Sequence, residues 1–516
     1  MENQTVETKM LTGKLGGRIM SRIVRSFTLG MAVVAMVFSL LYDSNTVMAE
    51  SRTSDSRSVE AFKNKLDKLV PDAQKRYGVP GAVIGIIQSG KVQFILNYGL
   101  EDKEQRKAIN DNTVFQVASM SKSLTAWGVM KLVEEGKISL DDPAEKYLTR
   151  WHLPDSKFNK DEVTIRRLLS HTAGLSVHGY LGIKPGKRIP TIEESLSGKG
   201  FLREPLEIVM QPGSEGSYSG GGYTLLQLIV EEVTGMTFNQ YMDKEILKPL
   251  GMKSSSFSND FTDSNMSKAY GYFGQKLPNF NFTEEAAAGL KTTMPDFLNF
   301  VLSNMDGSKG EARGRGILKS ESIDLMHTPI KSGSGLGVYS KELSDGSTFL
   351  YHSGDNRGWH SVYGFIPERR DGIVVFTNSD NGIDLRQDIY NFWIEYETGT
   401  LPEQYQAMEK SRNTHFAVAA ALTIALAVYL LFFMIKLKRG NRIFILRKEG
   451  KSFLKPFIRL LIPLFAGGAL YHILYKVDIL QLQGGLKNIA GCILVWLMVL
   501  FITGFFPKNV RKSKSS

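Results

Sequence analysis

One uncharged stretch near the C-terminal end limits the folds open to this chain more than any other feature. Residues 416–435 are almost wholly apolar and contain no charged side chain. A helix of about 20 such residues crosses the hydrocarbon core of a bilayer, where backbone polar groups must be bonded within their own segment. We therefore predict a transmembrane helix here, rather than a helix of a water-soluble domain.

Two further apolar runs follow the first. The run at 456–475 is weaker, because it is interrupted by Arg459, Pro463 and His472. Arg459 stands near the end of this run, where a long side chain can reach the membrane interface. A third run covers 489–506. We expect residues 414–516 to form a membrane domain of three transmembrane helices, preceded by a polar linker at 401–413.

The positive charge of the chain is concentrated in the same region. Residues 436–516 hold 15 Lys and Arg against 2 Asp and Glu, so a total of +11 leaves −2 for residues 1–435. Cytoplasmic loops of membrane proteins are rich in Lys and Arg, which places 436–455 and the tail in the cytoplasm and 476–487 outside. Three spans then put the preceding domain outside the cytoplasmic membrane. That domain is not basic, so nucleic acid is not an expected partner.

The N-terminal residues 1–49 have the layout of a signal peptide. An apolar run at 27–42 follows three cationic residues, Arg18, Arg22 and Arg25. Small residues ending at Ala49 suit a cleavage site, and Met20 is an alternative start. An uncleaved N-terminal anchor is the other interpretation, and both predict export. Residues 50–57 are polar and are expected to be flexible.

The middle of the chain, residues 58–400, has the periodicity of a domain with helices and strands. Ser58 is a candidate N-cap for a helix that ends before Gly78. Strands are expected at two early and four late positions: 82–88, 92–98, 336–339, 349–354, 362–367 and 373–378. A closing helix is expected at 383–397. Strands at both ends of the domain, with helices between them, predict that the two ends build one sheet.

Residues 119–122 read Ser-Met-Ser-Lys at the head of a helical pattern that stops at Gly136. Positions i and i+3 share one face of a helix, so Lys122 would lie beside the Ser119 hydroxyl. A desolvated lysine can take the proton of a serine nucleophile, and helix N-terminal amides favour negative charge there. The pattern alone is weak, because residues 452–455 also read Ser-x-x-Lys, in a loop that we place in the cytoplasm.

Two other residues invite a catalytic interpretation. Tyr218 precedes the glycines at 220–222 and a helix closed by Gly235, a position that suits a loop or core tyrosine as well as a side chain in a cleft. His171 lies in a turn, which predicts a local hydrogen bond rather than catalysis. Residues 176–210 lack clear periodicity and are expected to form a loop region over the site.

Three motifs occur in order: Ser-Met-Ser-Lys at 119–122, Tyr-Ser-Gly at 218–220 and His-Ser-Gly at 352–354. Together they resemble the serine β-lactamase and penicillin-binding-protein superfamily. The nearest pattern is the branch of class C β-lactamases, D-alanyl-D-alanine carboxypeptidases and esterases. The resemblance covers about residues 58–400. It implies an α+β fold, in which an antiparallel sheet flanked by helices adjoins a helical subdomain, with the site between them.

The resemblance also implies roles for individual residues. Ser119 would be the acylated nucleophile, Lys122 would assist its deprotonation, and Tyr218 would be the general base and later the proton donor. A free tyrosine has a pKa of about 10, so we expect Lys122 and the helix amides to lower that of Tyr218. The amides of Ser119 and Asp355 would form the oxyanion hole.

The third motif lines the site in this family, and the chain departs from the pattern in two places. His352, Ser353 and Gly354 match the strand triplet, but His352 stands where β-lactamases have lysine. Gly220 stands where many relatives have asparagine. An imidazole is a weaker anchor for a substrate carboxylate than a permanent ammonium group. Both departures argue against an efficient β-lactamase and leave acyl transfer intact.

The resulting expectation is a multi-pass serine hydrolase of the cell membrane with its catalytic domain on the extracytoplasmic side. Its substrate would be a small peptide-like or β-lactam-like molecule, such as a D-amino-acid-containing peptide. The layout also resembles membrane-bound D-aminopeptidases that activate nonribosomal-peptide prodrugs. An esterase of the same branch remains open, as does a penicillin-recognising sensor that is acylated without turnover. The absence of a cytoplasmic effector domain counts against the sensor.

Metal and cofactor chemistry is not expected. Cys492 is the only cysteine, so neither a disulfide framework nor a cysteine-rich zinc site is possible within one chain. The sequence contains no His-Glu-x-x-His and no Gly-x-Ser-x-Gly, the signatures of zinc peptidases and of α/β-hydrolases.

Overall fold

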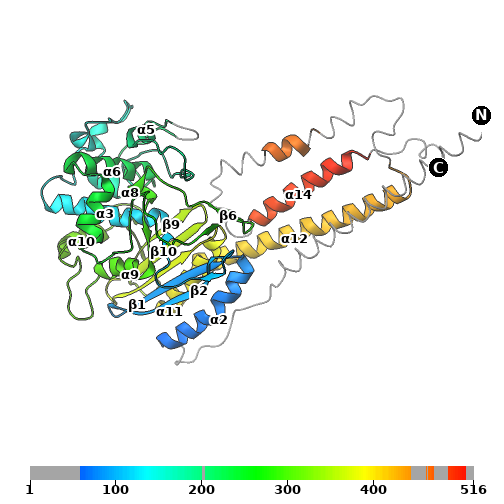
Figure 1. Ribbon diagram of the computed structural model, residues 1–516, viewed down its shortest axis with the longest axis horizontal. Helices are drawn as coiled ribbons and strands as arrows, with labels where there is room; N and C mark the ends of the chain where they lie inside the picture. Colours follow the sequence, from blue (N-terminus) through cyan, green and yellow to red (C-terminus); the bar gives the residue numbers. More distant parts are fainter. Residues whose placement is uncertain (1–57, 200–203, 443–460, 462, 470–485, 507–516) are drawn as a thin grey trace, which may run out of the picture. The chain divides into compact units, whose positions relative to one another are not determined.

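The computed structural model describes residues 58–199, 204–442, 461, 463–469 and 486–506 (Figure 1). Its contacts divide the chain into two compact units, of which the first runs from Asp55 to Met408 and the second includes Glu409 to Ser516. The predicted signal peptide and the segment at 50–57 lie outside the described residues, so both stay predictions.

A seven-stranded antiparallel sheet organises the first unit. Its strands lie in the order β3-β2-β1-β11-β10-β9-β8. Their bounds are β1 (Gly81–Gln88), β2 (Lys91–Asp102), β3 (Lys107–Ala108), β8 (Tyr339–Glu342), β9 (Thr348–Asn356), β10 (Trp359–Ile366) and β11 (Asp371–Thr377). Early β1 pairs with late β11, with Ile84 opposite Val375, which confirms that the two ends of the domain build one sheet. The strand expected at 336–339 begins only at Tyr339.

Both faces of the sheet are covered, and β1 shows how. Ile84 and Ile86 face one core, which α2 (Val59–Tyr77) and α11 (Gly382–Thr398) complete. Val83 and the other alternating residues face a second core, formed with α9 (Met294–Ser303) and the remaining helices. Figure 1 shows α2 and α11 along one face of the sheet and α9 at the other. Burial on both faces explains why the central strands are apolar without alternation.

The helix ends follow the cues in the sequence. The Ser58 hydroxyl accepts from Ala61 N at 3.1 Å at the start of α2, and Gly78 closes that helix at a φ of 74°. Gly235 ends α6 (Gly220–Thr234) in the same left-handed conformation, with a φ of 68°. Such caps satisfy polar groups that a helix leaves unbonded at its ends.

The helical region is built around α3 (Ser121–Glu134), which is buried on nearly all sides. It shares one core with α6 and with the short helices α4 (Ile165–Leu169), α7 (Phe238–Met242) and α8 (Glu285–Ala288). The stretch at 176–210 contains one short helix, α5 (Ile192–Leu196), and is otherwise irregular where the structure describes it. The first unit therefore has the α+β architecture that the sequence predicted.

The second unit contains the described part of the predicted membrane domain. α12 (Glu403–Lys438) starts in the first unit, and of the described helices it alone is long and apolar enough to cross a membrane. Most of the expected linker at 401–413 is therefore helical. α14 (Leu486–Gly504) is a shorter apolar helix along α12, where Trp496 Nε1 donates to Leu422 O at 2.9 Å. The second candidate span lies largely outside the described residues, so the three-helix topology stays a prediction.

Candidate active site

Ser119 lies in a tight turn between a short strand and the central helix. The 3₁₀ turn Ala118–Met120 leads directly into α3, and Ala118 has a left-handed φ of 49°. A non-glycine residue in this conformation is uncommon and often marks a site where geometry is imposed. Ala118 and Met120 are buried, whereas Ser119 is partly exposed. The turn therefore presents one hydroxyl to solvent.

Lys122 reaches this hydroxyl from the first turn of α3. Its Nζ lies 3.1 Å from Ser119 Oγ and donates to Ala287 O at 2.7 Å. The side chain is only 2% exposed, and burial lowers the pKa of Lys122 to about 7. Removing an ammonium group from water favours its neutral form. Near neutral pH a substantial fraction of Lys122 is thus a free amine that can accept the proton of Ser119.

Tyr218 meets the same hydroxyl from the other side. It hydrogen-bonds Ser119, and Lys122 Nζ lies 4.9 Å from the centre of its ring. Burial nevertheless raises the pKa of Tyr218 above its ordinary value, and the bond to Ser119 offsets this only in part. The expected lowering of that pKa is therefore wrong for the free enzyme. The resting site thus contains a neutral phenol beside a lysine whose pKa is about 7.

The His-Ser-Gly triplet lies on β9, next to the Ser119 turn. A Cβ on Gly354 would lie 2.0 Å from Val117 O, so only glycine permits this approach. Ser361 of the adjacent β10 donates to the same carbonyl at 3.0 Å. β8 pairs with β9 only as far as Tyr351. Side chains alternate along a strand, so Ser353 and His352 point to opposite faces of the sheet. The predicted contact of Ser353 with substrate stays a prediction.

His352 is neutral in this environment. It is 3% exposed, and burial together with nearby Lys122 lowers its pKa to about 4. Its Nδ1 lies 2.7 Å from Ser353 O, and a carbonyl can only accept, so Nδ1 carries the proton. The residue that replaces the lysine of β-lactamases is therefore uncharged at neutral pH. It does not supply a cation for a substrate carboxylate.

The Asp355 side chain is fully engaged within the protein. Its carboxylate lies 2.8 Å from Arg386 Nη1 of α11 and 2.6 Å from His360 Nδ1. Burial would raise the pKa of Asp355, but Arg386 and His360 hold it at about 2. Arg386 also donates to Gly354 O and Ser361 O, at 3.2 and 2.8 Å. This network fixes the backbone of β9. The Asp355 carboxylate is occupied by it, so only the backbone amide of Asp355 could take part in an oxyanion hole.

Gly220 begins α6, and the missing asparagine has a structural reason. A Cβ at this position would lie 3.0 Å from His178 O and 3.2 Å from the Tyr180 ring. The backbone N–H of Gly220 donates to His178 O at 3.1 Å, and Tyr180 Oη lies 2.8 Å from Thr224 Oγ1. The segment around His178 therefore occupies the space into which an asparagine side chain would extend.

His171 contributes to the site, although the sequence predicted only a local role. Its Nδ1 accepts from Ser219 N at 3.2 Å, which confirms the local hydrogen bond, and its φ is 57°. Its ring also lies 4.4 Å from the ring of Tyr218, while His178 lies 4.8 Å from that ring. Burial lowers the pKa of His171 far below its ordinary value. His171 thus packs as a neutral ring against Tyr218.

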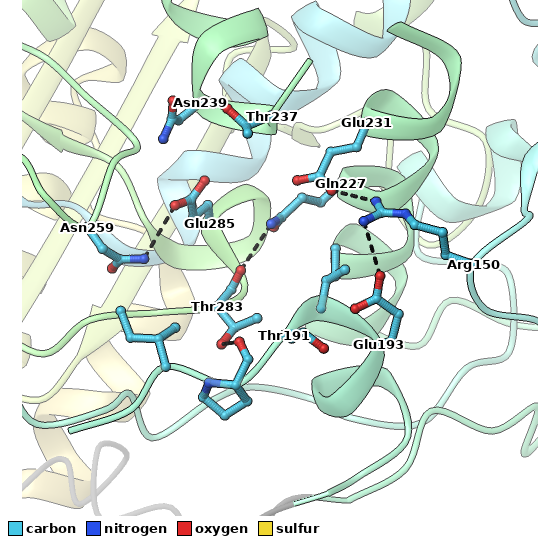
Figure 2. A pocket seen from close by; sticks show the side chains of 13 residues that line it. Arg150, Thr191, Glu193, Gln227, Glu231, Thr237, Asn239, Asn259, Thr283 and Glu285 are labelled. Atoms are coloured by element: carbon cyan, nitrogen blue, oxygen red, sulfur yellow. Dashed lines mark hydrogen bonds and ion pairs between the residues drawn. The ribbon is translucent and has the colours of Figure 1, made fainter. Parts of the chain in front are cut away.

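A cavity of about 380 Å³ adjoins α8 (Figure 2). Glu285 of α8 lines it, while Ala287 two residues later accepts from Lys122. Arg150 closes one side through ion pairs with Glu193 and Glu231, at 3.1 and 2.6 Å. Because the nucleophile lies elsewhere, we assign the cavity no part in the chemistry.

Most of the predicted site residues lie close together in the structure, and other residues support them. The structure brings together Ser119, Lys122 and Tyr218, with His352 and Gly354 next to them. It adds three supports that we did not single out: Ala287, Arg386 and His360. Arg386 is buried in the closing helix, where Lys and Arg are seldom found without a partner.

The chain was compared with known proteins. A family model described as Beta-lactamase matches residues 66–395. Protein flp of Staphylococcus aureus is 26% identical over 341 residues, 63% of this chain and 64% of the relative. The serine beta-lactamase-like protein LACTB of human mitochondria is 26% identical over 409 residues, 62% of this chain and 74% of the relative. The matches thus leave about a third of this chain, and of Protein flp, uncovered.

Solved structures give the same picture. The octameric penicillin-binding protein homologue from Pyrococcus abyssi is 28% identical, with a TM-score of 0.58 over 68% of this chain and 81% of that one. A class C beta-lactamase shares the fold at 22% identity, with a TM-score of 0.52 over 66% of this chain and 97% of that one. The residues matched by the family model include the whole sheet with β9, the Ser119 turn and Tyr218. The chain therefore belongs to the beta-lactamase family of serine hydrolases.

Proposed function

We propose that this protein is a membrane-anchored hydrolase that acts through an acyl-enzyme on Ser119. The observation that carries the proposal is the 3.1 Å contact between Ser119 Oγ and the buried amine of Lys122, whose pKa is about 7. A serine hydroxyl is a weak nucleophile until a neighbouring base accepts its proton. A lysine kept in water would be protonated and unable to do so.

The proposed cycle has two halves. Lys122 takes the proton of Ser119 as Oγ bonds to the substrate carbonyl carbon, and the amides of Ser119 and Asp355 stabilise the oxyanion. The leaving group departs with a proton from Tyr218, which Lys122 replaces, so charge and protons balance. Water then attacks the ester on Ser119 and passes a proton to the same pair, which returns it to Ser119 Oγ as the acid is released. Tyr218 is a proton relay in this scheme, consistent with its raised pKa.

The substrate class that we propose lacks an essential carboxylate. His352 is neutral, with a pKa of about 4, and the segment around His178 fills the space of the family's asparagine. Penicillins and carboxypeptidase substrates carry a carboxylate beside the scissile bond, and a neutral imidazole binds it less well than an ammonium group. Amides and esters of D-amino acids, including those cleaved by an aminopeptidase, need no such anchor. The edge of β9 beyond Tyr351 suits an extended peptide.

Charge and hydropathy support the cellular location that we propose. The apolar part of α12 suits a membrane span, and the Lys- and Arg-rich residues 436–455 that follow suit the cytoplasmic side. The catalytic domain then lies outside the cytoplasmic membrane, where peptidoglycan stem peptides and secreted peptides are available. The multi-pass topology with three spans is part of the proposal.

Covalent labelling tests the proposal. Wild-type protein should react with a fluorophosphonate at Ser119, and Ser119→Ala should abolish labelling and hydrolysis without changing the melting temperature by more than a few degrees. Persistent labelling at another serine would overturn the assignment. Matched D-amino-acid esters with and without a free carboxylate then test the substrate class. We expect kcat/KM to be unaffected or raised when the carboxylate is absent.

Labelling with a penicillin, followed by a panel of amides and esters, separates a hydrolase from a sensor. A penicillin adduct on Ser119 that persists for hours, with no hydrolysis of any amide or ester in the panel, would favour the non-turnover sensor. Release within minutes would support the hydrolase.

A further inference from the structure

One small hairpin of the first unit carries an unusual tip. β5 (Ala269–Tyr270) and β6 (Lys276–Leu277) are joined by a five-residue turn that holds Phe273. Phe273 is 94% exposed, whereas the other large apolar side chains exposed in the described part of this unit are at most 51% exposed. A phenylalanine held almost wholly in water gains free energy from any apolar partner, so this position suits a contact surface.

The tip is held rigidly by its root. Tyr270 N donates to Asn378 O at 3.0 Å, and Asp380 N donates back to Tyr270 O at 2.8 Å. The Tyr270 hydroxyl accepts from Lys103 N at 2.7 Å. Within the turn, Gly271 N donates to Gln275 O at 2.8 Å. Phe273 is therefore presented by an ordered hairpin, which reduces the entropy lost when it binds.

The surroundings of the tip are cationic. Lys103 Nζ lies 3.5 Å from Gly274 O and 5.3 Å from the centre of the Tyr270 ring. Arg106 and Lys276 are also exposed. Glu104, which pairs with Lys276 at 3.1 Å, offsets one of these charges and leaves the surface positive. Exposed aromatic rings flanked by Lys and Arg are typical of surfaces that bind anionic lipid headgroups.

The chain leaves this unit close to the hairpin. Asn381, which precedes α11, donates through Nδ2 to Tyr272 O at 3.1 Å. Tyr405 in the first turns of α12 bonds Asp388 of α11 at 2.9 Å. Asn381 and Asp388 are seven residues apart, a rise of about 10 Å along a helix. The root of the hairpin and the start of the apolar helix are thus both fixed to the first half of α11.

We propose that Phe273 at the tip of this hairpin, with Lys276 and with Lys103 and Arg106 of the turn between β2 and β3, contacts a bilayer surface containing anionic phospholipid. Phe273 would enter the headgroup region while the three cations bind lipid phosphates. Because α12 tethers the unit near the hairpin, this contact needs no further affinity to find the membrane. It would hold the first unit in one orientation instead of leaving it free to rotate on its tether.

A site-specific fluorophore tests this contact in the full chain. Cys492 is the only cysteine, so Cys492→Ser provides a background for Phe273→Cys labelled with an environment-sensitive dye. Ile330→Cys is the matched control, since Ile330 is 43% exposed and lies near β8, at the sheet edge opposite β3. Both are reconstituted into vesicles of phosphatidylcholine and phosphatidylglycerol with a quencher attached near the headgroups. Thermal unfolding of each variant confirms folding.

We expect the dye at 273 to shift to shorter wavelength and to be quenched several-fold more than the dye at 330. Replacing Lys103 and Lys276 by Glu, or omitting phosphatidylglycerol, should weaken binding of the tip to the vesicle, and the equilibrium constant should fall by about fivefold per lost cation. Added salt should act in the same direction. Equal quenching at both positions, or quenching at 273 that ignores lipid charge, would overturn the proposal and leave the tip for a protein partner.

Discussion

Gly354 of β9 lies against the carbonyl oxygen of Val117, so closely that a Cβ would come within 2.0 Å of that atom. This contact joins the strand that lines the site to the turn that presents Ser119. The glycine of the His-Ser-Gly motif, its third residue, is thus explained by packing. It sets the distance between the nucleophile and the strand.

Gly354→Ala should therefore separate β9 from the Ser119 turn. We expect a loss of about 1–3 kcal/mol in the free energy of unfolding, typical of an overpacked core. The rate of labelling by a fluorophosphonate should fall at least about tenfold, because a small misplacement of reacting groups has a large effect on rate. Gly179→Ala is the control, since a Cβ there would meet nothing within 4 Å. Unchanged labelling in Gly354→Ala would show that the spacing is not critical.

The pH dependence of acylation should report Lys122. Its pKa of about 7 means that the free amine, which accepts the proton of Ser119, accumulates as pH rises through 7. Labelling by a neutral reagent should rise with one inflection near pH 7 and then level off. His352→Asn should keep this inflection, because the pKa of His352 is about 4. A profile that is flat from pH 5 to 9 would argue against Lys122 as the base.

The free energy of unfolding should also depend on Lys122, because burial of this lysine destabilises the folded protein at low pH. The pKa of Lys122 falls from 10.5 in an ordinary environment to about 7 in the folded protein, so folding releases its proton between these values. The cost to stability is complete below about pH 7 and disappears as pH rises toward 10.5. Lys122→Met should thus be stabilising, with the largest gain at low pH. Melting temperatures of both proteins at pH 6 and pH 9 measure the difference.

Comparison of sequence and structure shows which kinds of information a single chain contains. Ser58, Gly78 and Gly235 specified helix ends through local chemistry, and the apolar runs of β1 and β11 specified buried strands. Residues that support the site from distant parts of the chain could not be identified from the sequence. Arg386 supports β9 from a helix whose pairing with the sheet no local pattern encodes, and Ala287 supplies only a backbone oxygen. The neutral states of Tyr218 and His352 also depend on burial, which spacing along the chain does not specify.

His171 should prove to be a positioning residue. Its ring supports Tyr218 at 4.4 Å and its Nδ1 holds Ser219 N, but its pKa lies well below neutrality. His171→Asn retains a hydrogen-bond acceptor and loses the ring, so we expect kcat to fall about 10-fold to 100-fold through misplacement of Tyr218. The inflection near pH 7 should remain where it is. If the inflection disappeared, His171 would itself be titrating in the reaction.

Tyr218→Phe tests the relay most directly, because it removes only the hydroxyl. The ring and its contacts with His171 and Lys122 remain, so the melting temperature should change little. Turnover should fall by about 10²–10⁴-fold, the usual size of a general acid–base contribution, with KM little affected. Acylation by a reagent with a good leaving group should fall less, since such a group departs without a proton. Lys122→Ala should be about as harmful, and the double variant scarcely worse, because both residues serve one proton-transfer path. A fully active Tyr218→Phe protein would remove Tyr218 from the path and leave Lys122 to carry protons in both halves of the cycle.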